Sequence, residues 1–110
     1  KNLNIIWGNH DRPELIKHCF SECYDLHSLK ISKSRLIVLC HYALAIWNQS
    51  HRNSIHLYGH SHGSLPDDPN ALSMDVGVDT NNYYPYSMDD IALKMSKKTF
   101  APLDHHGARE

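Results

Sequence analysis

Residues 54–63, SIHLYGHSHG, join an apolar segment to two histidines that stand one residue apart between glycines. Ser54 to Tyr58 is predicted to be a β-strand, because it is short and rich in β-formers. Gly59 and Gly63 permit a sharp turn directly after it. Paired imidazoles in such a turn are more typical of a metal site than of a core, so further ligands are expected elsewhere in the chain.

Two other predicted strands also run into polar, metal-capable side chains. Residues 2–7 (NLNIIW) are followed by Gly8, Asn9 and His10, and residues 35–40 (RLIVLC) run into His41. Ligand sites in α/β sheets gather at the carboxyl ends of strands. Residues two apart in an extended chain point the same way and lie about 6.6 Å apart. His60 and His62 could therefore face two different ions about 3.5–4 Å apart.

The remaining segments predict a layered α/β arrangement. Ser87 and Asp90 form a capping-box pattern that opens a helix through Lys97. The other expected elements are a helix from Arg12 to Phe20 capped by Asp11, a weakly patterned strand over residues 24–31, a short helix over 43–50 and a kinked strand over 71–79.

Composition limits the class of protein. The chain has 110 residues, 41% hydrophobic and 21% charged, with a net charge of -1, which suits one domain or part of one. This charge argues against a nucleic-acid surface or a polybasic membrane patch, and no apolar run approaches the roughly 18 residues that span a bilayer. Cys19, Cys23 and Cys40 are expected to be free thiols, which favours a cytoplasmic protein, although the first two could form a zinc half-site on one helix face.

The motifs GNHD (residues 8–11), a histidine after an apolar strand (His41) and GHSH (residues 59–62) occur in this order. Together they resemble the calcineurin-like metallophosphoesterases, whose pattern runs D-x-H, G-D, G-N-H-[DE], H and G-H-x-H. VGVD at residues 76–79 also resembles a strand of small bacterial and phage members. The resemblance covers residues 3 to about 95 and implies a layered sheet-and-helix sandwich, of which this chain is the C-terminal half.

The resemblance also implies a site with two divalent ions, of Mn, Fe, Zn or Ni, that hydrolyses phosphate mono- or diesters. Asn9, His41 and His60 would bind one ion, and His62 would bind the other. His10 would lie beside the substrate phosphate, stabilising charge or protonating the leaving oxygen. Asp11 would fix the orientation of His10. Nucleic acid is expected only as a substrate.

The family's two aspartate blocks do not occur in the chain, and LDHH at residues 103–106 lies at the wrong end to replace them. The chain also begins without Met, inside an expected strand. We therefore expect a partial phosphoesterase domain over residues 1–101 and a polar tail over 102–110, with the missing N-terminal half as a partner. The alternative is a non-catalytic remnant or binding module of the same fold. Structural roles are expected for Asp75 and Asp79, and exposure for the histidines without a motif: His51, His56, His105 and His106.

Overall fold

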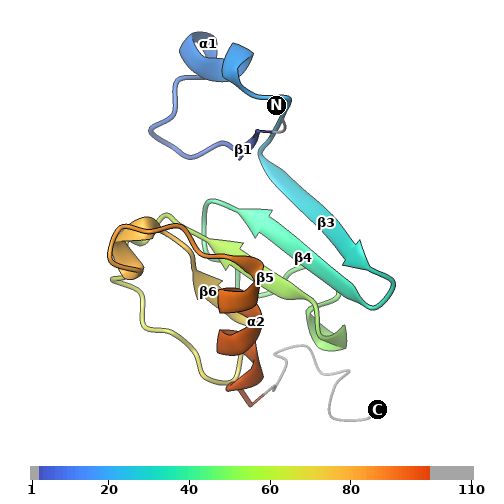
Figure 1. Cartoon of the computed structure of the whole chain (residues 1–110). Coiled ribbons are helices and arrows are strands. Elements are labelled where there is room, and N and C mark those ends of the chain that lie inside the picture. Colours follow the sequence, from blue (N-terminus) through green and yellow to red (C-terminus); the bar gives the residue numbers. More distant parts are fainter. Residues whose placement is uncertain (1–2, 100–110) are drawn as a thin grey trace.

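Two β-sheets organise residues 3–99, the part of the chain that this computed structural model describes. The smaller sheet pairs β1 (Asn4–Ile6) in parallel with β2 (Glu22–Tyr24). The larger sheet has the order β3-β4-β5-β6. Its strands are β3 (Leu26–Ser32), β4 (Arg35–Cys40), β5 (Ile55–Tyr58) and β6 (Ser73–Asp75). β3 is antiparallel to β4, whereas β4, β5 and β6 are mutually parallel, so the carboxyl ends of these three strands share one edge (Figure 1).

The helices are short apart from α2 (Met88–Ser96). The Ser87 side chain accepts a hydrogen bond from the Asp90 backbone, and the Asp90 side chain accepts one from the Ser87 backbone, so the predicted capping box is confirmed. The remaining helical segments are α1 (Pro13–Ile16) and three single turns, η1 (Lys17–Cys19), η2 (Ser50–Arg52) and η3 (Val78–Thr80).

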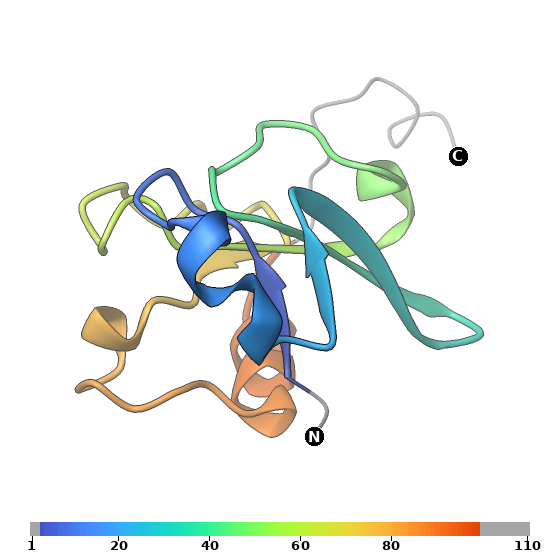
Figure 2. The same cartoon turned by 90° about the horizontal axis from the view of Figure 1, so that it is seen from above.

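The larger sheet is covered on both faces. On one face, Ile91 and Met95 of α2 pack against Ile55, Leu57 and the core cluster around them. On the other face, Trp47, in the long loop between β4 and β5, lies against the ring of His56, with their centroids 5.3 Å apart. Figure 2 shows this loop and α2 on opposite sides of the sheet. The alternation of side chains along β5 explains why one strand serves both layers.

The β1–β2 sheet and α1 stand apart from the larger sheet as a separate lobe (Figure 1). β2 leads into β3 through a bend at Asp25, so one extended segment contributes to both sheets. The strand predicted over residues 24–31 is therefore divided at Asp25. A cavity of about 190 Å³ lies between the lobes, lined mainly by side chains of β1, β2, β3 and β4.

Some predicted local structures are wrong. Residues 43–50 form an irregular loop instead of a helix, because Leu44 N–H donates to the His56 ring and Gln49 adopts a left-handed φ of 60°. Arg12, not Asp11, occupies the N-cap of α1, and its side chain makes no capping bond. The kinked strand over 71–79 is reduced to β6 followed by η3. Cys19 and Cys23 lie in η1 and β2, so they do not share a helix face, although all three thiols are free as expected.

The α/β class is confirmed in general terms, while the specific phosphoesterase sandwich stays a prediction. Within residues 3–99, no helix has the length and apolar character needed to cross a membrane. The tail predicted over residues 102–110, with His105 and His106, lies outside the described residues.

Candidate metal centre

The backbone of His41 joins the ends of β4 and β5. Its carbonyl oxygen accepts hydrogen bonds from Gly59 N–H, at 3.0 Å, and from His60 N–H, at 2.8 Å. β4 and β5 are paired in parallel, with Leu39 opposite Leu57, so both chains leave the sheet at the same edge. The sequence segments that carry His41 and His60 are therefore held side by side by main-chain bonds.

Three of the predicted ligands converge at this edge. His41 Nε2 lies 2.9 Å from Asn9 Oδ1 and 3.1 Å from His60 Nδ1. The His41 and His60 rings meet edge to face, with centroids 5.0 Å apart and an interplanar angle of 76°. The loop after β1 brings Asn9 into this group across the gap between the two lobes. These residues lie 32 and 19 positions apart along the chain from His41, so only the fold brings them together.

The chemistry of this cluster fits a cation. A neutral imidazole nitrogen carries either one proton or one lone pair, so His41 Nε2 cannot make a good hydrogen bond to both neighbours. A divalent ion would instead accept a lone pair from all three atoms. Ligand atoms about 2.1 Å from an ion and at right angles to each other lie about 3.0 Å apart, close to the two observed separations. Neutral nitrogen and amide oxygen donors suit borderline transition metals.

Gly8 makes room for the His41 ring. A Cβ atom at this position would lie 2.9 Å from both Cε1 and Nδ1 of His41. Gly59, on the other side of the site, has no atom within 4 Å of the corresponding position. Only Gly8 is therefore required by close packing, which gives a physical reason for the glycine in the GNHD motif.

Asp11 closes the turn that presents Asn9 and His10. Its Oδ2 accepts a hydrogen bond of 2.7 Å from Gly8 N–H, and its own N–H donates to the Gly8 carbonyl at 3.2 Å. The His10 side chain is exposed at the tip of this turn. The recorded bonds of Asp11 thus fix the loop; the predicted orienting role toward the His10 ring stays a prediction.

The electrostatic surroundings keep His41 neutral. Burial holds the pKa of His41 below its ordinary value, and the adjacent His60 lowers this pKa further. Asp11 opposes both effects, while His10 and His62 lie close enough to add smaller lowering effects on the pKa. A neutral imidazole is the form that binds metals.

His62 belongs to a separate network. Its Nδ1 lies 2.7 Å from Asp79 Oδ2, and its backbone has a φ of 50°. The bonded partner comes from η3, beyond β6. The tandem histidines therefore face different partners, as expected if they serve different ions, although the one-ion-each assignment stays a prediction.

No cluster of acidic residues completes the site within the described part of the chain. Among residues 3–99, no group of three or more His, Cys, Asp and Glu side chains is placed to hold a metal ion. The convergent group has only His41 and His60 of these residue types, and Asn9 is its third member. The side chains present thus fit part of a coordination sphere without an anionic ligand.

Two supporting residues were missed or misjudged from the sequence. His56 was expected to be exposed, but it is fully buried and its Nδ1 lies 3.0 Å from the Val38 carbonyl oxygen. The only sequence signal was its place in the middle of an apolar strand. Asp79 was expected to serve a turn, whereas its carboxylate bonds His62. Asp75 does have the expected structural role, accepting hydrogen bonds from Gly63 N–H and Gly77 N–H.

Comparison of the chain with protein-family models, curated proteins and solved structures finds no match in any of the three.

Proposed function

We propose that this chain contributes the nitrogen and amide ligands of a dinuclear metal centre that hydrolyses phosphate mono- or diesters. The observation that carries the proposal is the convergence of Asn9, His41 and His60 at separations close to those within a coordination sphere. Divalent ions in such a centre supply Lewis acidity and lower the pKa of water. The resemblance in sequence to calcineurin-like metallophosphoesterases supports the same reaction.

Each residue has a role in this proposal. Asn9 Oδ1, His41 Nε2 and His60 Nδ1 bind one ion, because these are the atoms that face one another. His62 binds the second ion. His10 is exposed beside Asn9 and donates a proton to the leaving oxygen or stabilises its charge, while Asp11 holds the turn that carries it.

The proposal requires carboxylate ligands from a segment outside residues 3–99. Anionic ligands contribute strongly to the affinity for divalent ions, and the convergent group has none. β1 is hydrogen-bonded to β2 on one edge, and within the described residues no strand pairs with its other edge. We propose that the strands carrying the family's D-x-H and G-D blocks pair with that edge.

A second candidate is a binding module that holds a single ion without catalysis. The neutral character of the convergent group favours this alternative, because three neutral ligands can hold one ion weakly but do not supply a bridge to another. The two candidates differ in whether hydrolysis appears when the carboxylate blocks are supplied.

The test compares two glycines that flank the site. The chain is titrated with Mn²⁺, and hydrolysis of p-nitrophenyl phosphate and its diester is measured with and without a segment carrying the two aspartate blocks. Gly8→Ala should weaken Mn²⁺ binding roughly tenfold or more, because its Cβ would displace the His41 ring. Gly59→Ala is the matched control and should bind Mn²⁺ as the unaltered chain does.

Hydrolysis should require both Mn²⁺ and the added segment, and His41→Ala should abolish it. Binding without hydrolysis would favour the single-ion module. Rapid turnover by the chain alone, unchanged in His41→Ala, would contradict the proposed ligand set.

A further inference from the structure

The ring of His62 is held in one orientation although its side chain is 74% exposed. Its backbone adopts the left-handed region, with a φ of 50°, which is uncommon for a residue other than glycine and costs free energy unless neighbouring contacts maintain it. The contact that holds the ring is the bond of 2.7 Å between His62 Nδ1 and Asp79 Oδ2. Asp79 is the better anchored partner, because only 28% of its side chain is exposed.

Asp75 and Gly77 hold the two ends of this contact in place. Asp75 Oδ2 accepts a hydrogen bond of 2.8 Å from Gly63 N–H, directly after His62, and Asp75 Oδ1 accepts one of 2.9 Å from Gly77 N–H. A Cβ atom at Gly77 would lie 2.7 Å from Asp79 Oδ1 and 3.1 Å from Asp75 Oδ1. The absence of a side chain at position 77 thus allows the Asp79 carboxylate to approach the strand end and reach His62.

The contact determines which ring nitrogen is available. An ionised carboxylate can only accept hydrogen bonds, so the bonded Nδ1 of His62 must carry the proton. In a neutral imidazole, the lone pair then resides on Nε2. We propose that Asp79 is a positioning residue that fixes this tautomer and presents Nε2 of His62 to a divalent cation. The identity of the ligand rests on the proposed phosphoesterase function; the tautomer assignment does not.

This arrangement gives the tandem histidines opposite chemistry. His60 directs Nδ1 toward His41 Nε2, whereas His62 uses Nδ1 for Asp79 and leaves Nε2 available. Carboxylate partners of this kind orient a ligating imidazole and raise its basicity. Asp79 therefore does for His62 what ring packing and the main-chain bonds to His41 do for His60.

The test reads the tautomer directly in the metal-free chain. The ¹⁵N shifts of the His62 ring are measured by long-range correlation above pH 7.5, with His62→Gln used for assignment. The unaltered chain should show a protonated Nδ1 and an unprotonated Nε2. Asp79→Ala should move the proton population toward Nε2 and weaken Zn²⁺ binding, followed at the His62 resonances, by about 10- to 100-fold.

Two further variants separate positioning from loss of charge or of fold. Asp89→Ala removes the same charge from the first turn of α2 and should leave the His62 shifts unchanged. Gly77→Ala keeps the carboxylate but displaces it, so it should shift the tautomer partly toward Nε2–H. Dispersed amide signals from β5 report that each variant is folded.

The outcomes distinguish this inference from the proposed function. An Nε2–H tautomer in the unaltered chain, or the same tautomer and Zn²⁺ affinity in Asp79→Ala, would overturn the role of Asp79. If the tautomer and Zn²⁺ affinity respond as expected but no phosphate ester is hydrolysed with the aspartate blocks supplied, the phosphoesterase proposal fails and the positioning role stands.

Discussion

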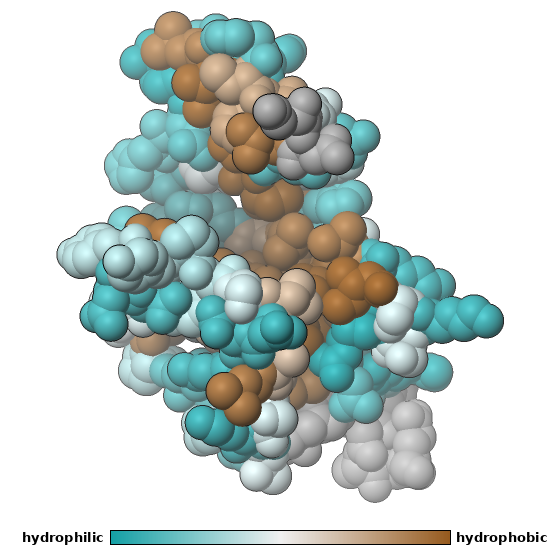
Figure 3. All heavy atoms as spheres, in the orientation of Figure 1, coloured by the Kyte–Doolittle hydropathy of each residue, from teal (hydrophilic) through white to brown (hydrophobic). Residues whose placement is uncertain are grey.

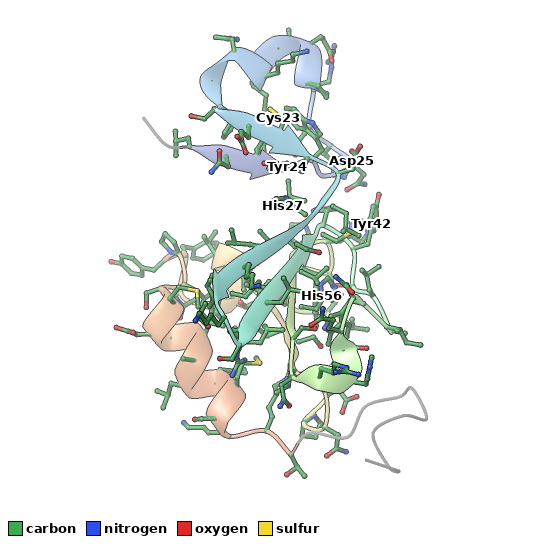
Figure 4. All side chains as sticks on the ribbon, turned by 90° about the vertical axis from the view of Figure 1, so that its right-hand side faces the viewer. Cys23, Tyr24, Asp25, His27, Tyr42 and His56 are labelled. Carbon is green, nitrogen blue, oxygen red and sulfur yellow. The ribbon has the colours of Figure 1, made fainter. Side chains whose placement is uncertain are left out.

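His56 shows how a single buried side chain supports the candidate site without touching it. The Nδ1 of its ring donates to the Val38 carbonyl in β4, and its Nε2 accepts from Leu44 N–H in the loop after His41. Figure 4 places His56 inside the larger lobe, with Tyr42 closer to the junction of the two lobes. The ring therefore anchors the chain on both sides of His41. Both bonds require neutral imidazole, because protonated Nε2 could not accept from Leu44.

The stability of the fold should decrease at mildly acidic pH because of His56. Burial holds the pKa of His56 below its ordinary value, although the Val38 and Tyr42 carbonyls oppose this shift in part. The unfolded chain then binds a proton near pH 6.5 that the folded chain does not bind. This contribution to the free energy of unfolding is complete above pH 6.5 and is lost as the pH falls toward the folded-state pKa, by at most about 1.4 kcal/mol per pH unit.

Urea unfolding between pH 5.5 and 7.5 checks this expectation. The slope of the free energy of unfolding against pH should be smaller in His56→Phe than in the unaltered chain. His18→Gln, at an exposed site, should keep the original slope. The nearby Tyr58 does not titrate in this range, because burial and, to a lesser extent, Asp67 and Asp75 raise its pKa. Equal slopes in the unaltered chain and His56→Phe would contradict the assignment.

At the scale of elements, Lys98 joins the end of α2 to the loop before β6. Its side chain is only 4% exposed, and Nζ lies 2.6–3.0 Å from four oxygen atoms. These acceptors are Asp67 Oδ1 and the carbonyl oxygens of Asp68, Ala71 and Ser73. The next residue, Thr99, also donates to the Pro69 carbonyl. One ammonium group therefore organises a proline-containing loop that has few main-chain bonds of its own.

Lys98→Met should loosen this loop while retaining the apolar stem of the side chain. We expect the free energy of unfolding to fall by about 1–3 kcal/mol, because several carbonyl groups lose a charged donor. Hydrogen exchange of amides in residues 67–73 should accelerate. Lys97→Met is the matched control, since Lys97 is adjacent and exposed. A similar change in both variants would mean that Lys98 acts only through general charge.

At the scale of the whole molecule, the two lobes are held together weakly. The smaller sheet has only β1 and β2, and sheets of two strands are marginal in water. Figure 3 shows apolar residues gathered in the middle of one face, where the lobes meet and where β3 is exposed. Leu26, Leu29 and Ile31 of β3 are 42–50% exposed. An apolar surface of this kind beside an unpaired edge of β1 favours association with further strands.

A segment that carries the two aspartate blocks should therefore stabilise the smaller lobe selectively. In the chain alone, the Ile5 and Ile6 amides should exchange with solvent much faster than amides of β5. Coexpression with the segment should raise the soluble yield and slow exchange in β1. β5 is the internal control, because Ile55 and Leu57 are already buried. Equal protection of β1 and β5 in the chain alone would contradict this account of the lobes.

The sequence by itself determined the elements whose signals are local. The apolar run of β4, the capping box of α2 and the turn after β5 depend on residues close together in the chain, so period and turn chemistry predict them. The placement of Asn9, His41 and His60 after strands also predicted their convergence, since parallel strands end at one edge. The helix predicted over residues 43–50 failed because the ring of His56, far from it in sequence, bonds Leu44 N–H.

Only the tertiary structure decided the contacts that join distant segments. The pairs His62–Asp79 and Lys98–Asp67 are separated by 17 and 31 residues, and neither lies within a helical or strand period. The burial of His56 depended on which face of β5 the loop after His41 would cover. The close fit of Gly8 to the His41 ring and of Gly77 to two carboxylates is likewise a matter of packing. Such contacts arise from the meeting of surfaces, and local sequence patterns carry no information about that meeting.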